Sequence, residues 1–271
     1  MDFYLFAIVV LFVLALIDLS VGVSNDAVNF LNSAIGSRVA TRRTILIVAS
    51  LGIVMGSLFS SGIMEVARKG IFNPEMFTFA DVMVVFLAVM IADVLLLDLF
   101  NTFALPTSTT VSIVFELLGA ATAVAILHMI HVPDSPPFME FINGGRALAI
   151  IAGIGLSVVV AFIMGTIIQF FSRVVFTFAE TRRTAGVRII WSALSLSAII
   201  YFLFIKGLKG ASFITPEIQE LARENTLYLF MASFIVCVVV AAGIQRLGKN
   251  PLAFVVLAGT FSLAMAFASN D

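Results

Sequence analysis

Long apolar segments separated by short polar breaks run through almost the whole chain. They lie at about 3–23, 45–64, 82–103, 107–129, 147–171, 189–205 and 226–244, and a further one begins at Pro251. Most are close to the roughly 20 residues that an α-helix needs to cross a bilayer, and none has the alternation of a membrane-spanning strand. The pattern predicts an all-α fold, a polytopic transmembrane helix bundle that forms one transmembrane domain over residues 1–271. The clearest loop is expected at 130–145.

The first apolar segment leads into a polar stretch, Ser24–Asn29, that includes a carboxylate. An ionised side chain near the bilayer centre costs about 2.5–3.5 kcal/mol on insertion scales, so Asp26 needs a compensating charge and a functional role is favoured. Asn25, Asn29 and Asn32 follow helical spacing and share one face. We expect a broken first helix here, whose oxygens suit a hard cation and whose amide N–H groups can donate to an oxyanion. For Asn32, a hydrogen bond between helices explains the residue equally well.

The same triplet returns at the end of the sequence as Ser269, Asn270 and Asp271. Basic residues gather in alternate connections, so the positive-inside rule places those connections in the cytoplasm and the N-terminus outside. The two triplets then lie on antiparallel helices, which is typical of an inverted-topology repeat. We expect residues 1–245 to hold the first repeat and linker spans, and 246–271 the start of an incomplete second repeat. The basic residues are Arg38, Arg42, Arg43, Arg173, Arg182, Arg183, Arg188, Arg246 and Lys249.

A second polar segment follows Pro106, which should end the preceding span because proline disfavours helix at the residue before it. Ser108, Thr109 and Thr110 then place hydroxyls at the start of the next helix, where backbone N–H groups have no intrahelical partner. Such a helix start is a ready anion site, above all for phosphate. Glu116 lies two turns further along the same polar face as Ser108. The alternative interpretation is an ordinary capped turn between two spans.

Three more carboxylates lie within apolar segments. Asp98 precedes Asn101 by three residues and leads toward the proline break, so it is expected to help coordinate a cation. Asp18 lies seven residues before Asn25 and can project to the same side. For Asp18 and Asp93, a hydrogen-bonded contact between helices and a functional role are equally open.

Composition narrows the class of protein further. Hydrophobic residues make up 61% of the chain and charged residues 11%, against roughly 45–50% and 25% in soluble domains. The net charge of −1 says nothing about partners, because most of the charges lie in the loops, and no nucleic-acid partner is expected. Cys237 is the only cysteine, so no disulfide forms within the chain. With only two histidines besides, no cofactor and no resident metal are expected, beyond a transported sodium ion.

Two motifs resemble the inorganic phosphate transporter (PiT) family of secondary carriers. The family has a Gly-Ala-Asn-Asp-Val-Ala-Asn signature in both inverted halves, each followed by a Pro-x-Ser-[Ser/Thr]-[Ser/Thr] segment. The matching stretches here are Asn25-Asp26-x-x-Asn29 and Pro106-x-Ser108-Thr109-Thr110, in the same order. The chain departs from the pattern at Val23-Ser24 and at Val111, where the family has Gly-Ala and commonly His.

The resemblance implies a site built from both motifs. Substrate binding is expected at Asn25, Asn29, Ser108, Thr109 and Thr110, and cation binding at Asp26 and Asn25, with Asp98 added from its own position. The implied function is a symporter for inorganic phosphate, driven by sodium ions or protons, in the plasma or inner membrane. It makes and breaks no bond and is therefore not an enzyme, and a homo-oligomer is compatible with it. The alternatives are a carrier of another tetrahedral oxyanion, such as sulfate, and a membrane scaffold subunit that transports nothing.

Overall fold

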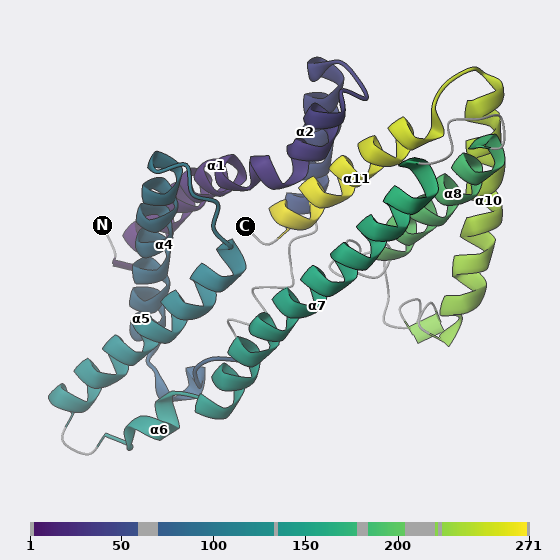
Figure 1. Ribbon diagram of the computed structural model, residues 1–271. Coiled ribbons are helices and arrows are strands. Elements are labelled where there is room, and N and C mark those ends of the chain that lie inside the picture. Colours follow the sequence, from purple (N-terminus) through teal and green to yellow (C-terminus); the bar gives the residue numbers. More distant parts are fainter. Residues whose placement is uncertain are drawn as a thin grey trace. The chain divides into compact units, whose positions relative to one another are not determined.

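The computed structural model describes residues 3–58, 70–132, 135–177, 184–203, 220–221 and 224–269. Within these ranges the chain is helical and contains no strand, only an isolated bridge between Phe72 and Ile142. The all-α expectation is confirmed (Figure 1). The helices are α1 Phe3–Ser37, α2 Arg42–Leu58, η1 Pro74–Met76, α4 Phe79–Thr102, α5 Thr109–His131, α6 Phe138–Phe141, α7 Gly144–Thr177, α8 Thr184–Phe202, α10 Thr226–Arg246 and α11 Pro251–Ala268.

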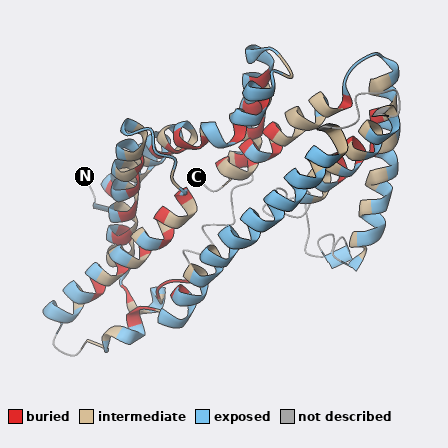
Figure 2. Ribbon diagram, viewed as in Figure 1, coloured by how far each residue is buried: buried red, intermediate tan, exposed pale blue. Residues whose placement is uncertain are grey.

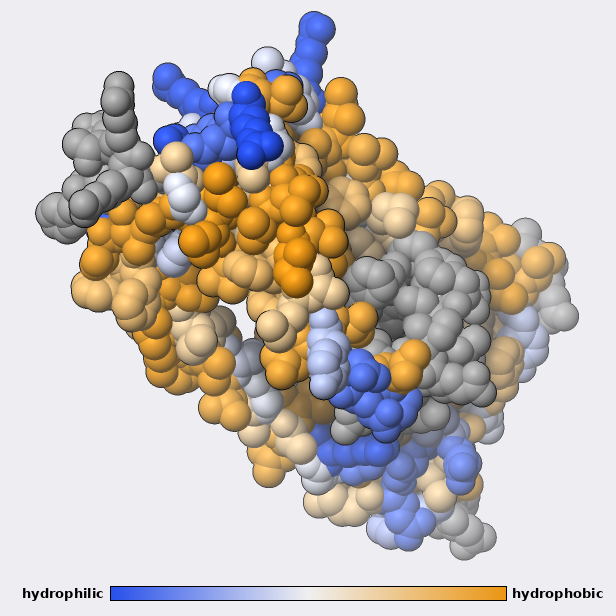
Figure 3. Space-filling model, turned by 90° about the vertical axis from the view of Figure 1, so that its right-hand side faces the viewer, coloured by the Kyte–Doolittle hydropathy of each residue, from blue (hydrophilic) through white to orange (hydrophobic). Residues whose placement is uncertain are grey.

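Seven of the described helices are long and apolar enough to cross a membrane: α1, α4, α5, α7, α8, α10 and α11. Many of their large apolar side chains are exposed, and α7 is exposed along most of its length (Figure 2). The space-filling view shows the same property, since hydrophobic residues cover most of that face and hydrophilic residues gather in separate groups (Figure 3). A continuous apolar surface of this extent is unfavourable in water and favourable in contact with lipid. The chain is a multi-pass membrane protein.

The first helix differs from the expectation of a break. Helix α1 is continuous over 35 residues, through the whole of Ser24–Asn29. The hydroxyls of Ser20 and Ser24 donate to the carbonyls of Leu16 and Ser20, four residues earlier, at 2.9 and 2.7 Å. These bonds satisfy the polar side chains within the helix, and the stretch contains no proline that would remove a backbone donor.

The chain divides into two compact units, and the division falls inside two helices. One unit contains the described residues of 3–28 and 70–160, and the other those of 29–58 and 161–269. Helices α1 and α7 each run from one unit into the other. The division into a first repeat at 1–245 and a second from 246 remains a prediction.

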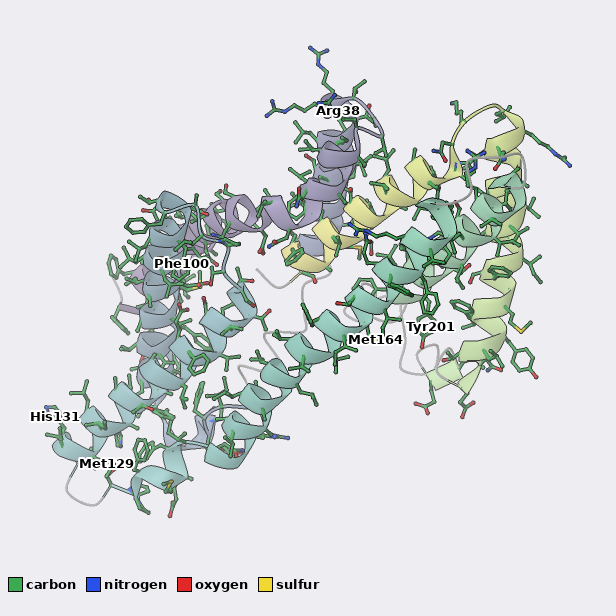
Figure 4. All side chains as sticks on the ribbon, viewed as in Figure 1. Arg38, Phe100, Met129, His131, Met164 and Tyr201 are labelled. Carbon is green, nitrogen blue, oxygen red and sulfur yellow. The ribbon has the colours of Figure 1, made fainter. Side chains whose placement is uncertain are left out.

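In the first unit, α1 and α4 run in the same direction and α5 runs back beside α4. Near one end, the rings of Tyr4 and Phe79 lie 5.4 Å apart. At the same end, Nδ1 of His128 approaches the Asp81 carboxylate at 3.7 Å. The Asp81 carboxylate also completes a capping box with Thr78 that starts α4. These contacts fix the N-terminal ends of α1 and α4 and the C-terminal end of α5 together. Figure 4 labels Met129 and His131 at that end of α5.

A short segment before α4 is held against the segment around α6. The backbone N–H of Asn73 donates to the carbonyl of Phe141 at 2.9 Å, and the backbone N–H of Asn143 donates to the carbonyl of Ile71 at 3.0 Å. The ring of Phe77 packs edge-on against those of Phe72 and Phe141, at centroid distances of 5.4 and 5.2 Å. These three buried rings belong to the same hydrophobic core as the buried residues of α4 and α5.

In the second unit, α2 crosses α11 at very short range. A Cβ atom at Gly52 would lie 2.5 Å from the carbonyl oxygen of Phe261, and one at Gly56 would clash with the carbonyl oxygen of Met265. Only glycine lets the two backbones approach this closely, as in small-xxx-small helix pairs of membrane proteins. Phe30 of α1 packs near Phe267 of α11, with ring centroids 6.2 Å apart. Helices α8 and α10 pack on a second small core.

Candidate functional site

The side chain of Asn25 joins α1 to the connection between α4 and α5. Its Nδ2 donates to Oδ1 of Asn101 at 2.9 Å and to the carbonyl oxygen of Leu105 at 3.0 Å. Its Oδ1 accepts from the backbone N–H of Thr107 at 2.8 Å. Nδ2 of Asn101 in turn donates to the carbonyl oxygen of Val21 at 3.0 Å. We call these five residues the amide cluster.

The connection itself has a defined backbone shape. The N–H groups of Ala104 and Leu105 donate to the carbonyls of Asn101 and Phe100, at 3.0 and 2.9 Å. This is the Schellman pattern that closes a helix, and Ala104 takes the left-handed conformation it requires, with φ of 54°. Pro106 follows directly, as the sequence predicts. Figure 4 labels Phe100 near this end of α4.

Helix α5 starts at the hydroxyl-rich segment as expected. Ser108 is its N-cap, and the Ser108 hydroxyl accepts from the N–H of Val111 at 3.4 Å. Ser108 is exposed, Thr110 is partly exposed and Thr109 is buried. The first N–H groups of a helix have no partner within it, so the helix start presents donors and hydroxyls beside the amide cluster. That chemistry suits an oxyanion.

The predicted residues of α1 divide between the two units. Asn25 and Asp26 are buried in the first unit, with Asp26 only 1% exposed. Asn29 is exposed and belongs to the second unit. The geometry gives Asn25 a clear additional role, because one amide N–H donates to Asn101 near the end of α4 and the other to Leu105 in the connection that precedes α5. Direct substrate binding by Asn25, Asn29 or the three hydroxyl residues remains a prediction.

The predicted cation ligand Asp98 is exposed on α4, and its neighbour Asp93 is the buried one. The buried stripe of α4 follows a four-residue spacing through Val89, Asp93 and Leu97 toward Asn101. Asp98 lies off this stripe. A role for it in cation binding remains a prediction.

The structure places Asp93 beside two other carboxyl groups. Asp93 of α4 lies near Asp18 of α1, and Glu116 of α5 lies near both. We call Asp18, Asp93 and Glu116 the acid cluster. In the sequence, Asp18, Asp93 and Glu116 lie on three separate apolar segments, and only Asp18 and Asp93 were considered as a pair of similar carboxylates. One signal was available: each residue lies seven or eight positions from a residue at the amide cluster or the α5 start, two turns along its own helix.

The second copy of the signature falls mostly outside the described residues. Ser269 is the C-cap of α11, and its hydroxyl donates to the carbonyl oxygen of Ala266 at 2.8 Å. Asn270 and Asp271 lie outside the described residues. In the first copy, by contrast, Ser24 lies within a continuous helix.

A multi-pass fold with a polar helix start between two spans is typical of the class of membrane transport proteins. A profile of the phosphate transporter family matches residues 22–271. The chain belongs to the phosphate transporter family.

Among its relatives are archaeal proteins that carry the provisional name of phosphate permeases. One from Pyrococcus abyssi is 27% identical over 202 residues, which cover 70% of this chain and 45% of the relative. One from Thermococcus kodakarensis is 26% identical over 193 residues, with the same two shares. One from Pyrococcus furiosus is 33% identical over 98 residues, which cover 35% of this chain and 24% of the relative. The chain thus spans about half the length of the first two relatives.

The fold is also similar to a solved structure titled the sodium-dependent phosphate transporter. The TM-score is 0.59, with 17% sequence identity, and the match covers 97% of this chain and 76% of that chain. At this identity the similarity supports the fold, which agrees with the family assignment.

Proposed function

We propose that this chain is part of a secondary carrier that moves inorganic phosphate across a membrane together with sodium ions or protons. The observation that carries the proposal is the attachment of α1 to the α5 start through Asn25. It brings the buried carboxylate of Asp26, one residue further on, to the same part of the first unit. A cation and an oxyanion that bind near one another can then move together.

The family supports the substrate, since the matching profile describes phosphate transporters. The positive-inside rule supports a plasma or inner membrane orientation with the N-terminus outside. The exposed side chain of Arg38, after the end of α1, points away from the helices in Figure 4 and suits a cytoplasmic connection.

The test is uptake of radiolabelled phosphate by proteoliposomes that contain the full gene product, in a sodium series and in a pH series. Thr109→Val and Thr110→Val remove one hydroxyl each while keeping the side-chain shape. Loss of a hydroxyl that pairs with the anion costs about 1–3 kcal/mol, so uptake at limiting phosphate should fall by about five- to 150-fold.

Thr166→Val in α7 is the matched control, because the Thr166 hydroxyl donates only to the carbonyl of Phe162 in its own helix. It should leave uptake unchanged. Equal inhibition of phosphate uptake by sulfate would favour a general oxyanion carrier. Absence of any uptake by a folded protein would favour the scaffold alternative.

A further inference from the structure

The acid cluster lies in the interior of the first unit, at one level of its three helices. Asp18 is fifteen residues from the start of α1, Asp93 fourteen from the start of α4, and Glu116 fifteen from the end of α5. These positions are about 21–23 Å from the end marked by Tyr4, Phe79 and His128, at 1.5 Å per residue. Asn25 and Asn101 are about 33 Å from that end, by the same measure. The acid cluster therefore lies nearer the middle of the spans than Asn25 and Asn101 do.

Asp18 and Asp93 are buried side chains, and carboxylate oxygens of Asp18 and Glu116 lack donors among the described residues. Asp18 is 5% and Asp93 2% exposed. Oδ1 of Asp18 and both carboxylate oxygens of Glu116 are buried without a hydrogen-bond partner among the described residues. A buried carboxylate oxygen without a donor is costly unless a positive charge or a proton reaches it.

The three helices supply no positive charge at this level. The sequences of α1 and α4 contain no Lys, Arg or His, and α5 has only His128 and His131, in its last turn. Arg146, at the start of α7, is exposed. Of the other acidic groups near the His128 end, Asp81 caps α4 and faces His128, and Glu75 and Glu140 are exposed. Within the described parts of α1, α4 and α5, no basic side chain compensates the cluster, so a proton or a bound cation can do so.

The geometry favours protons. The carboxyl groups of Asp18 and Asp93 lie close to one another, and two adjacent buried carboxylates favour taking up a proton, because like charges at short range do not both stay ionised. Thr109 and Ser112 are buried on the same face of α5 as Glu116, three and four residues apart, between Glu116 and the α5 start.

We propose that Asp18, Asp93 and Glu116 form a proton-binding site within the membrane, two helical turns from the α5 start. A proton that binds there converts one carboxylate to a carboxyl group that donates to its neighbour. The link between this proton and phosphate movement rests on the proposed function. The existence of the site does not.

Infrared difference spectroscopy of the purified protein in lipid, between alkaline and acidic buffer, tests the site directly. The wild-type protein should show the carbonyl band of a protonated carboxyl group, and Asp18→Asn and Glu116→Gln should each lose part of it. Glu140→Gln is the matched control, because Glu140 is exposed on α6 and its carbonyl, not its carboxylate, accepts from Asn73. It should keep the full band. Glu116 is only partly buried, so Glu116→Gln carries the test if Asp18→Asn does not fold.

A wild-type protein without this band, or a band that both variants retain in full, would overturn the proposal. Phosphate uptake across a pH series separates it from the proposed function. Wild-type uptake should vary with pH by up to about tenfold per unit, the limit for one proton, and Glu116→Gln should flatten this dependence. A band that the variants lose in a protein that takes up no phosphate would leave the proton site standing and reject the carrier. Uptake without the band would reject the proton site alone.

Discussion

Asn25 connects two segments that are some 80 residues apart in the chain. Nδ2 has two hydrogens and both are used, on Asn101 and on Leu105. Oδ1 accepts from Thr107. One side of the group must donate two hydrogen bonds and the other side must accept one. An amide can do both, whereas a carboxylate of the same shape has no hydrogen to donate.

Asn25→Asp should therefore destabilise the protein although it changes the volume very little. The variant places carboxylate oxygens against the Asn101 and Leu105 oxygens, and each lost bond to a buried group costs about 1–3 kcal/mol. Thermal denaturation of the purified protein measures the effect. Asn32→Asp, at an exposed position of the same helix, should melt like the wild type. Equal melting of the two variants would show that the amide cluster does not hold the connection.

At this scale the sequence singled out two stretches that the structure brings together, but not the partner of each side chain. The motif around Asn25 and the α5 start were both recognised, yet residue types do not reveal which group receives the amide hydrogens of Asn25. Asp98 was preferred to Asp93 because it is nearer Asn101 along the chain. The structure buries Asp93 instead, since side-chain packing follows the four-residue spacing of the helix face rather than distance in sequence.

The helices themselves were largely predictable because each is an apolar segment of bilayer length. Predicted and observed ends agree within a few residues for α4, α8 and α10. The continuity of α1 was not predicted, because the residue types do not reveal that serine hydroxyls donate to carbonyls of their own helix. The short helix α6 was not predicted either, since four residues give no periodic signal.

The crossing of α2 and α11 gives a sharp prediction at the scale of elements. Gly56→Ala should destabilise the second unit, because its Cβ would overlap the Met265 carbonyl and backbone cannot shift cheaply in a packed helix pair. Gly119→Ala in α5 is the matched exchange, because a Cβ there meets nothing within 4 Å. It should be neutral or stabilise by up to about 1 kcal/mol, from helix propensity.

Melting curves of both variants in the same detergent compare them. A Gly56→Ala protein as stable as Gly119→Ala would mean that the two helices do not cross as closely as described.

For the whole molecule, the orientation of the spans is the main prediction. Single cysteines at Ser37 and Leu247, in a Cys237→Ala background, should be labelled by an impermeant reagent only from the cytoplasmic side. A cysteine at Met139 should be labelled only from outside. All three positions are exposed, so access depends on the side of the membrane. Labelling of Ser37 and Met139 from one face would contradict the orientation drawn from the basic residues, and with it the antiparallel arrangement of the two signatures.

The level of the acid cluster also has an electrical meaning. Asp93 and Glu116 lie about three-fifths to two-thirds of the way along α4 and α5 from the His128 end. A unit charge that crosses the whole membrane gains about 2.3 kcal/mol per 100 mV. A proton that enters from the His128 end and stops at the cluster would therefore gain about 1.5 kcal/mol at 100 mV. That is roughly a tenfold change in occupancy, so the charge state of these three side chains would follow the membrane voltage as well as the pH.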